Sequence, residues 1–248
     1  MALHSILSYL TKAGIGSRRH CFHLLTTGRV SVNDQVVLSS TTPIRQGIDV
    51  IAIDGRVLES VVHRVYLKLN KPPGVLSTTY DDRNRPTIMD YIPKRFRDIR
   101  LFPVGRLDAH STGLILLTND GEFANRVTHP RFRVEKEYHV EFNNKLTPSQ
   151  CKALEEGVII NGERTAPSKV RLLSEGDSFG YSITINEGKK RQIRMMCLAV
   201  GQVVRSLERV RIQSILLGGL LPGRVQEVSI KEVHMMFHEY EHIEEQVK

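Results

Sequence analysis

The apolar positions of the first sixty residues predict two short helices. SILSYLTKA begins at Ser5 and RRHCFHLLTT follows Ser17, and small polar residues at such places favour helix N-caps. The two stretches stop at Gly14 and Gly28, where glycine readily takes the left-handed conformation that ends a helix. Each predicted helix is therefore bounded by a cap at its start and a glycine after its end.

Short strands follow these helices. RVSVN and QVVL flank a turn at Asn33-Asp34, and GIDVIAIDGRVL contains Asp54-Gly55, a strong hairpin signal. The pattern then resets around Ser60 to Arg64. We therefore expect a small αα–β domain over residues 1–60, with a domain boundary before residue 64.

From residue 64 onward, strand and helix patterns mix. VYLKLNKPPG, EKEYHVEF and SFGYSITINEG alternate as strands do, and LILLT reads as a buried strand. A short helix is expected near EFANRVT, a second one begins at the Thr147 capping box, and a third, QIRMMCLAV, ends at Gly201. The fold class expected for the chain is α+β, with a mixed, mostly antiparallel sheet over residues 64–240 and a C-terminal tail over 241–248.

Composition narrows the class of protein. No run of about 18 apolar residues suggests a membrane span, and the apolar stretch of MALHSILSYLTKAG is too short and broken for a signal peptide. Cys21, Cys151 and Cys197 are far apart and form no CxxC pair. They are typical of reduced thiols, so we expect a cytoplasmic protein without a disulfide or zinc framework.

The charge balance indicates a polyanionic partner. The 35 Lys and Arg residues exceed the 27 Asp and Glu residues, which gives a formal net charge of +8. Such an excess favours nucleic acid above other partners. A basic protein without such a partner is the alternative that charge alone leaves open.

Three arginines of the first domain are candidates for phosphate contacts. Arg18 and Arg19 lie in the first turn of a predicted helix, where free backbone N–H groups attract phosphate, and Arg29 follows the helix stop. A solvated basic face is the alternative for each one. The segment GSRRHCFHLLTTGRVSVNDQVV resembles the S-four-like, αL-type RNA-binding domain over roughly residues 3–60. That resemblance implies that these arginines position RNA through its phosphates.

A second motif, PVGRLDAHSTGLILLTNDGEFANRVTHP, centres on Asp108. This residue stands in a loop directly before an apolar strand, two residues after Arg106. Loops held by rigid strands often carry catalytic groups, and a nearby cation keeps a carboxylate ionised for nucleophilic attack. The alternative is an aspartate that merely turns the loop, as we expect of Asp120.

GRLDAHSTGLILLTNDGE resembles the catalytic motif of the pseudouridine synthases, in the RsuA/RluB branch that acts on ribosomal RNA. The resemblance extends from KPPG at 71–74 to about residue 230, and His110-Ser111-Thr112 departs from many relatives. It implies that Asp108 is the nucleophile in the isomerisation of a flipped uridine to pseudouridine. Whether it attacks the sugar or the base stays open. The reaction needs no cofactor and no metal, and Arg106 is implied to hold phosphate or fill the vacated stack.

Two further catalytic residues follow from the same resemblance. Tyr138 of EKEYHV matches the tyrosine that stacks on the flipped base, and Arg194 of QIRMM matches the basic residue paired with the catalytic aspartate. A bidentate guanidinium suits the orientation of a carboxylate. Periodicity alone favours Tyr138 as a core residue of its strand, along with Val140 and Phe142, and the family resemblance favours the active-site role instead.

The remaining candidates are substrate-binding. NEGKKRQIRMMCLAVG clusters Lys189, Lys190 and Arg191 before a helix, although a solvated face is the alternative, for Lys190 in particular. Lys71 of KPPG is also placed among the substrate-binding residues. Leu217 is a candidate apolar contact under the base; Ile215 competes with it, and core packing is as good an interpretation of both.

One metal pattern is set aside, and two rival functions remain. His234, His238 and His242 recur at helical spacing, but no other residue matches them as ligands, so we expect a polar helix face. The rivals are a non-catalytic RNA-binding or ribosome-assembly protein and a metal-dependent nuclease that uses Asp108 and Asp120. We expect a monomer whose partner is ribosomal RNA or an assembly intermediate, with no membrane. The strings SRR, GRV and LLTNDGEFANR favour the large-subunit RNA.

Overall fold

The computed structural model describes residues 3–58, 63–174 and 179–237. By their contacts these residues form two compact units. The first unit comprises residues 1–65 with Arg95–Leu101 and Asn119–Gly121, and the second comprises Tyr66–Lys94, Phe102–Thr118 and the chain from Glu122 onward. The expected boundary falls partly on residues 59–62, and the expected tail at 241–248 lies wholly outside the described residues, as do His238 and His242.

The first unit contains the predicted helices and hairpins. Helix α1 covers Ile6–Lys12 and α2 covers Arg18–Thr26. The side-chain hydroxyl of Ser5 accepts a hydrogen bond from the backbone amide of Ser8, and that of Ser17 accepts one from the backbone amide of His20. Both predicted N-caps are therefore confirmed. The core of the unit is formed by the apolar faces of the helices and by strand residues: Ile6, Leu7, Leu10, Cys21, Leu24, Leu25, Val30, Ile44 and Ile51.

Two small sheets complete the first unit. The four-stranded sheet has the order β3-β2-β5-β6, and both of its expected turns are present, because Asn33, Asp34, Asp54 and Gly55 all have positive φ. Its strands are β2 Val30–Val32, β3 Gln35–Val36, β5 Ile51–Ile53 and β6 Arg56–Val57. The other sheet pairs β1 Leu3–Ser5 with β4 Pro43–Arg45, and its strands, three residues each, gave no sequence signal.

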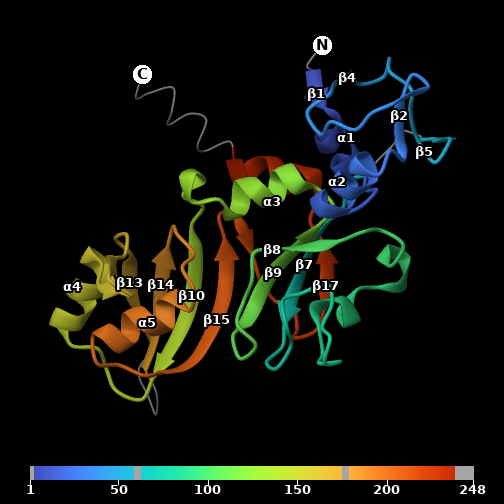
Figure 1. Cartoon of the computed structure of the whole chain (residues 1–248). Coiled ribbons are helices and arrows are strands. Elements are labelled where there is room, and N and C mark those ends of the chain that lie inside the picture. The colour runs from blue at the N-terminus through green and yellow to red at the C-terminus, as the bar shows by residue number, and fades with distance from the viewer. Residues whose placement is uncertain (1–2, 59–62, 175–178, 238–248) are drawn as a thin grey trace. The chain divides into compact units, whose positions relative to one another are not determined.

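The second unit is built on a nine-stranded sheet (Figure 1). Its main path runs β13-β14-β10-β15-β9-β7-β17, with β16 paired to β15 and β8 paired to β9. All of these pairs are antiparallel except β15 with β9, so the expected mixed, mostly antiparallel sheet is confirmed. The strands are β7 Tyr66–Lys71, β8 Phe102–Val104, β9 Thr112–Thr118, β10 Lys136–Phe142, β13 Lys169–Ser174, β14 Phe179–Ile185, β15 Val204–Ile212, β16 Ile215–Leu216 and β17 Val225–Glu227.

Helices pack on this sheet. Helix α4 (Pro148–Glu156) packs on β13, and α5 (Gln192–Ala199) packs on β15 and on the β11–β12 hairpin, Ile159–Ile160 with Glu163–Arg164. The Thr147 capping box before α4 is present. Helix α3 (Gly121–Thr128) adds Phe123 and Val127 to a core with strand residues such as Tyr66, Leu114 and Ile212. Short 3-10 turns, Ile88–Tyr91, Lys94–Phe96 and Pro130–Phe132, occur in the connections.

Strand β7 shows why its alternating pattern was only partly informative. Alternation of apolar and polar residues predicts one exposed face, yet Asn70 and Lys71 are buried, because β7 lies between β9 and β17. The amide nitrogen of the Asn70 side chain donates to the carbonyl oxygen of Leu220 over 2.7 Å. The polar side chain is thus buried with a partner, as burial requires.

Strands β9 and β15 approach each other most closely at Gly113. This glycine has φ +93°, and a Cβ placed there would stand 2.3 Å from the carbonyl oxygen of Arg209. It pairs with Arg209 in the parallel register. Only a residue without a side chain fits this backbone, because two of the three nearest obstructing atoms belong to the main chain of Arg209 on the neighbouring strand and cannot give way easily.

No helix of the described residues combines the length and apolar character that crossing a membrane would require.

We predict that Gly113→Ala lowers the free energy of unfolding by on the order of 2–4 kcal/mol, because it adds a backbone clash to a strained φ. The matched control is Gly162→Ala: Gly162 also has positive φ, at +82°, but nothing lies within 4 Å of its added Cβ. The control should cost only about 1–2 kcal/mol. Urea unfolding of both variants measures the difference, and equal losses would contradict the close-approach argument.

Candidate active site

The loop that carries Asp108 is held by hydrogen bonds from a buried ammonium group, that of Lys71. Lys71, at the end of β7, is fully buried. Its Nζ donates to the carbonyl oxygens of Pro72, Val75 and Ala109 over 2.9, 2.9 and 3.0 Å. The amide of Gly74 also donates to the carbonyl of Ala109 over 2.8 Å. The carbonyl oxygen of Ala109, the residue directly after Asp108, therefore accepts two hydrogen bonds that hold the loop in place.

A second anchor holds the residue directly before Asp108. The hydroxyl of Ser77 donates to the carbonyl oxygen of Leu107 over 2.9 Å and accepts the Leu107 amide over 3.1 Å. Both neighbours of Asp108 are thus bonded to the segment that follows β7, and the loop is rigid at the place where its carboxylate projects.

The surroundings of Lys71 correct its expected role in substrate binding. An ammonium group has three N–H donors, and all three of the bonds that Lys71 makes end on backbone carbonyls inside the protein. Burial lowers the pKa of Lys71 to about 8, and the negative charge of Asp108 acts in the opposite direction. Lys71 therefore supports the loop from within and has no surface to offer to a substrate.

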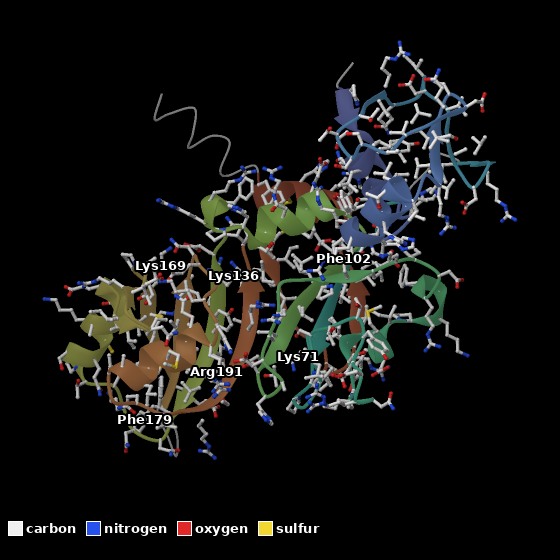
Figure 2. All side chains as sticks on the ribbon, in the orientation of Figure 1. Lys71, Phe102, Lys136, Lys169, Phe179 and Arg191 are labelled. Atoms are coloured by element: carbon white, nitrogen blue, oxygen red, sulfur yellow. The ribbon has the colours of Figure 1, made fainter. Side chains whose placement is uncertain are left out.

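A pocket of about 330 Å³ opens beside this loop. It lies entirely in the second unit, and its walls come from the Asp108 loop, the end of α3, strands β10, β14 and β15, and the segment before α5; Lys136 and Arg191 are labelled in Figure 2. The predicted site residues that line it are Arg106, Asp108, Tyr138, Lys189 and Arg191. These five residues, the first and last of which are 85 positions apart in the sequence, are thus brought to one cavity.

The ion pair with Asp108 is made by Arg191, not by Arg194. Arg191 Nη1 lies 3.6 Å from Asp108 Oδ2, and both side chains are partly exposed at the pocket. Arg194 Nη1 instead donates to the carbonyl oxygen of Val204 over 3.3 Å. The two arginines differ in their backbone positions: Arg191 directly precedes α5 with φ +54° and makes no capping hydrogen bond, whereas Arg194 lies inside the first turn of the helix. The pairing of Arg194 with Asp108 is absent here, and a catalytic role of Arg194 stays a prediction.

Tyr138 is both a buried strand residue and part of the pocket wall. It is only 8% exposed, on β10, and lines the cavity that Asp108 also lines. On the neighbouring strand it is opposite Arg209, whose guanidinium carbon lies 6.0 Å from the centre of the tyrosine ring. The two interpretations of Tyr138 are therefore compatible, since the ring is packed by the sheet and still faces the pocket.

Three pocket residues were missed by the sequence reasoning: Ser111, Lys136 and Arg209. Lys136 and Tyr138 are two positions apart on β10, so strand alternation, already recognised in EKEYHV, placed both on one face. Arg209 could not be found that way, because its face depends on a register shift between β10 and β15 at Glu137/Tyr138. Ser111 stood inside the Asp108 motif, but a serine in a loop gave no separate signal.

The cations around the pocket differ in whether they have a carboxylate partner within the protein. Arg106 and Lys190 line the pocket and are exposed. Lys189 donates to Glu163 Oε2 over 2.9 Å, which ties it to the β11–β12 hairpin. The first two are therefore available at the mouth of the pocket, whereas Lys189 has a carboxylate partner in the protein.

Leu217 does not contact the pocket. It is 6% exposed and packs in the core cluster that also contains Ile215, Leu114 and Phe123. Its place beside β16 turns it into that core, which fits the core-packing interpretation of Leu217 and Ile215. A contact of either residue with the base stays a prediction.

The arginines of the first unit fall into two groups. Arg18 and Arg19 are exposed at the first turn of α2. Arg29 is bound through two guanidinium nitrogens to the carboxylate of Asp54, and this bonding lowers the pKa of Asp54. Arg29 thus links the start of β2 to the Asp54-Gly55 turn, and its contact with phosphate stays a prediction.

The His234 pattern gains no support. Within residues 3–58, 63–174 and 179–237, no three His, Cys, Asp or Glu side chains gather as a metal site would require. The two other histidines of that pattern lie outside these ranges.

Comparisons with known proteins agree in one family. A family model described as RNA pseudouridylate synthase matches residues 65–199. The chain is 37% identical to ribosomal large subunit pseudouridine synthase B of Bacillus subtilis, over 90% of this chain and 91% of that protein. It is 38% identical to the protein of the same name in Vibrio cholerae, over 92% of this chain and 72% of the other. A crystal structure of a pseudouridylate synthase, 27% identical, matches with a TM-score of 0.67 over 94% of this chain and 99% of that one.

We predict that Lys71→Met lowers the free energy of unfolding by on the order of 3 kcal/mol, because three buried carbonyl oxygens lose their donor. The amides of Gly74 and Ser111 should exchange faster with solvent, since the loop loses its central support. Lys68→Met is the matched control: Lys68 lies on the same strand, is less buried, and donates to the carbonyl of Leu216. Hydrogen exchange at the loop that changes equally in both variants would contradict the anchoring role.

Proposed function

The chain belongs to the RNA pseudouridylate synthase family, and we propose on this premise that it isomerises selected uridines of ribosomal RNA to pseudouridine. Two relatives are named for the large ribosomal subunit, and this supports large-subunit RNA as the substrate. The proposal includes action in the cytoplasm, as a monomer, on naked RNA or an assembly intermediate, in which the target uridine is still accessible.

The observation that carries the proposal is the placement of Asp108. Its carboxylate stands on a loop anchored on both sides, is 36% exposed, and borders a pocket together with Tyr138 and Arg191. A nucleophile must be ionised, accessible and held in one direction. The guanidinium of Arg191 lies 3.6 Å from the carboxylate of Asp108, and the anchors supply the direction.

The residues fit the steps that the reaction requires. A uracil inside a stem cannot reach a pocket, so the nucleotide must be flipped out of its stack. In the proposal Tyr138 then offers its ring to the base, as aromatic side chains do for extruded bases. Arg106 and Lys190 at the mouth bind the flanking phosphates, and Asp108 makes and releases the temporary bond. The reaction rearranges one molecule, with no redox change and no donated group.

The first unit would bind RNA away from the reacting base. Arg18 and Arg19 are exposed on the first turn of a helix, where the unpaired backbone amides and the helix dipole also favour phosphate. Such contacts add affinity and orientation without reading sequence.

We predict that Asp108→Asn abolishes isomerisation, with a loss of turnover of at least roughly a thousandfold, because the amide cannot attack. RNA affinity and the unfolding transition should change little, since the replacement has nearly the same shape. Asp98→Asn, at an exposed position, is the control for the chemical change itself. Pseudouridine mapping of ribosomal RNA incubated with each protein measures the outcome. Turnover of Asp108→Asn within about tenfold of wild type, without deamidation, would remove Asp108 from the mechanism.

The same incubation separates the rival functions. A non-catalytic RNA-binding protein would leave the RNA chemically unchanged, and a metal-dependent nuclease would cleave it in a reaction that a chelator stops. Isomerisation that continues in chelator fits neither rival.

A second prediction concerns the division of labour. Arg18→Gln with Arg19→Gln should weaken RNA binding and reduce the slope of log K against log salt by about 1.5, because two phosphate contacts are lost. Single-turnover isomerisation at saturating enzyme should be unaffected. Arg45→Gln is the control within the same unit, because Arg45 is paired with Asp49 and should leave the slope as it is. An unchanged slope in the double variant would mean that these arginines do not contact phosphate.

A further inference from the structure

Two polar atoms on the pocket walls are buried without a partner. Among the described residues, Arg209 Nη2 and Ser111 Oγ are the buried side-chain nitrogen and oxygen atoms that lack a hydrogen bond. Both residues line the pocket, and they are 3% and 1% exposed. Leaving a buried polar group unsatisfied costs about 1–3 kcal/mol. That both such atoms belong to the walls of the same cavity indicates that a bound molecule supplies their partners.

A second cation stands at the same wall. Lys136 lines the pocket, and its Nζ donates to the carbonyl oxygen of Val134 over 3.0 Å. Burial, and after it the positive charge of Arg209, lowers the pKa of Lys136 to about 8. No carboxylate of the described residues forms an ion pair with either cation. Two like charges without a counter-charge favour a ligand that brings oxygen acceptors.

How deeply each cation lies in the pocket determines whether it can contact the base or the phosphates of a bound RNA. Arg106, Lys190 and Arg191 are exposed at the pocket, whereas Arg209 is almost fully buried. The phosphates of a flipped nucleotide remain joined to the strand and must stay near the mouth. Only the base can reach the inner wall, so the buried Arg209 and the half-buried Lys136 face the base and the exposed cations face the backbone.

We propose, resting on the proposed function, that Arg209, Lys136 and Ser111 recognise the edge of the flipped uracil. Arg209 and Lys136 donate to its two carbonyl oxygens, and the Ser111 hydroxyl accepts its N3–H. Cytosine presents an amino group in place of one carbonyl and lacks the N3–H, so it would set donor against donor and leave the buried groups unpaired. A site built to bond a particular edge rejects an analogue that cannot complete those bonds.

The same contacts would assist the reaction. During isomerisation the C1′–N1 bond breaks with its electron pair left on the base, and the C1′–C5 bond forms. C5 releases a proton to solvent, and N1 takes one up, so no oxidant or reductant is needed. The pair left on the detached uracil spreads to its carbonyl oxygens. Fixed donors that face those oxygens stabilise the charge as it develops.

The test combines protein variants with altered target bases. The probe is a transcript of the ribosomal RNA segment that the wild type modifies, with uridine, 2-thiouridine or 4-thiouridine at the target position. Sulfur is a weaker acceptor than oxygen, so we expect single-turnover rates of the wild type to fall about tenfold for at least one thio-base. Arg209→Met and Lys136→Met should each slow the uridine reaction by roughly 10- to 100-fold. For at least one of these two variants, replacing uridine by the thio-base that slows the wild type should cause little further loss of rate, because the donor to that position is already missing.

Matched controls separate recognition from packing. Arg205→Met lies on the same strand at an exposed position and should retain the wild-type response to sulfur. Arg209 Nε also donates to the carbonyl of Leu114 over 2.7 Å, so Arg209→Met can lose stability. Lys136→Met keeps that bond and remains informative if Arg209→Met does not fold.

Ser111→Ala provides the sharpest contrast. Its hydroxyl has no partner among the described residues, so its removal should leave the unfolding free energy unchanged or slightly higher. The rate on uridine should fall several-fold. A structural serine would give the opposite result, with lower stability and a normal rate.

Each outcome decides the proposal. If the wild type isomerises its target but sulfur slows wild type and every variant equally, the inner wall does not read the carbonyls. If the variants instead alter only the response to phosphorothioate beside the target, Arg209 and Lys136 bind phosphate and the proposal is wrong. A wild type that isomerises no ribosomal uridine overturns the proposed function itself, which is a different result.

Discussion

The buried ammonium of Lys71 is the interaction on which the site depends. Three carbonyl oxygens converge on it from the segment after β7 and from the residue that follows Asp108. Transferring a charge into the interior is costly unless hydrogen bonds replace the water that it loses. Here three do, and the nearby charge of Asp108 also favours the ammonium form. Asp108 thus favours the charge of the same ammonium group that holds its loop in place.

The parallel contact of β9 with β15 assembles the rest of the pocket. Gly113 lets β9 approach the backbone of Arg209, and the Asp108 loop runs directly into β9. The register shift in the pairing of β10 with β15 places Tyr138 opposite Arg209. Three strands therefore bring the loop, the aromatic ring and the buried guanidinium together, although Asp108 and Arg209 are 101 positions apart in the sequence.

The sequence predicted what local chemistry decides. The caps at Ser5, Ser17 and Thr147 and the Asp54-Gly55 turn were read correctly, because each depends on neighbouring residues. The motif around Asp108 was also found, because its residues are contiguous. The burial of Lys71 was not predicted, because whether a strand lies in the middle of a sheet cannot be told from its own alternating pattern. Sheet order is a long-range property that no segment of the chain contains by itself.

The same limit explains the errors around the pocket. Leu217 and Tyr138 both carry apolar surface on or beside strands, yet one faces the core and the other the cavity. Arg191 and Arg194 are three residues apart, but the positive φ of Arg191 sends it toward Asp108. In each case the residue type was informative and its direction was not, because direction is set by helix starts and by the pairing of distant strands.

The cations at the mouth of the pocket and those on its inner wall interact with charged ligands under different degrees of solvent screening. The exposed arginines and lysines at its mouth act through water, where salt screens an attraction over roughly 8–10 Å at physiological ionic strength. They can attract a polyanion from solution but discriminate weakly between bases. Arg209 lies behind the protein surface and Lys136 is half-buried beside it, where screening is weaker and an unpaired donor is expensive. A basic chain can therefore bind RNA broadly through one set of cations and be selective through the other, because selectivity arises where water cannot replace a missing partner.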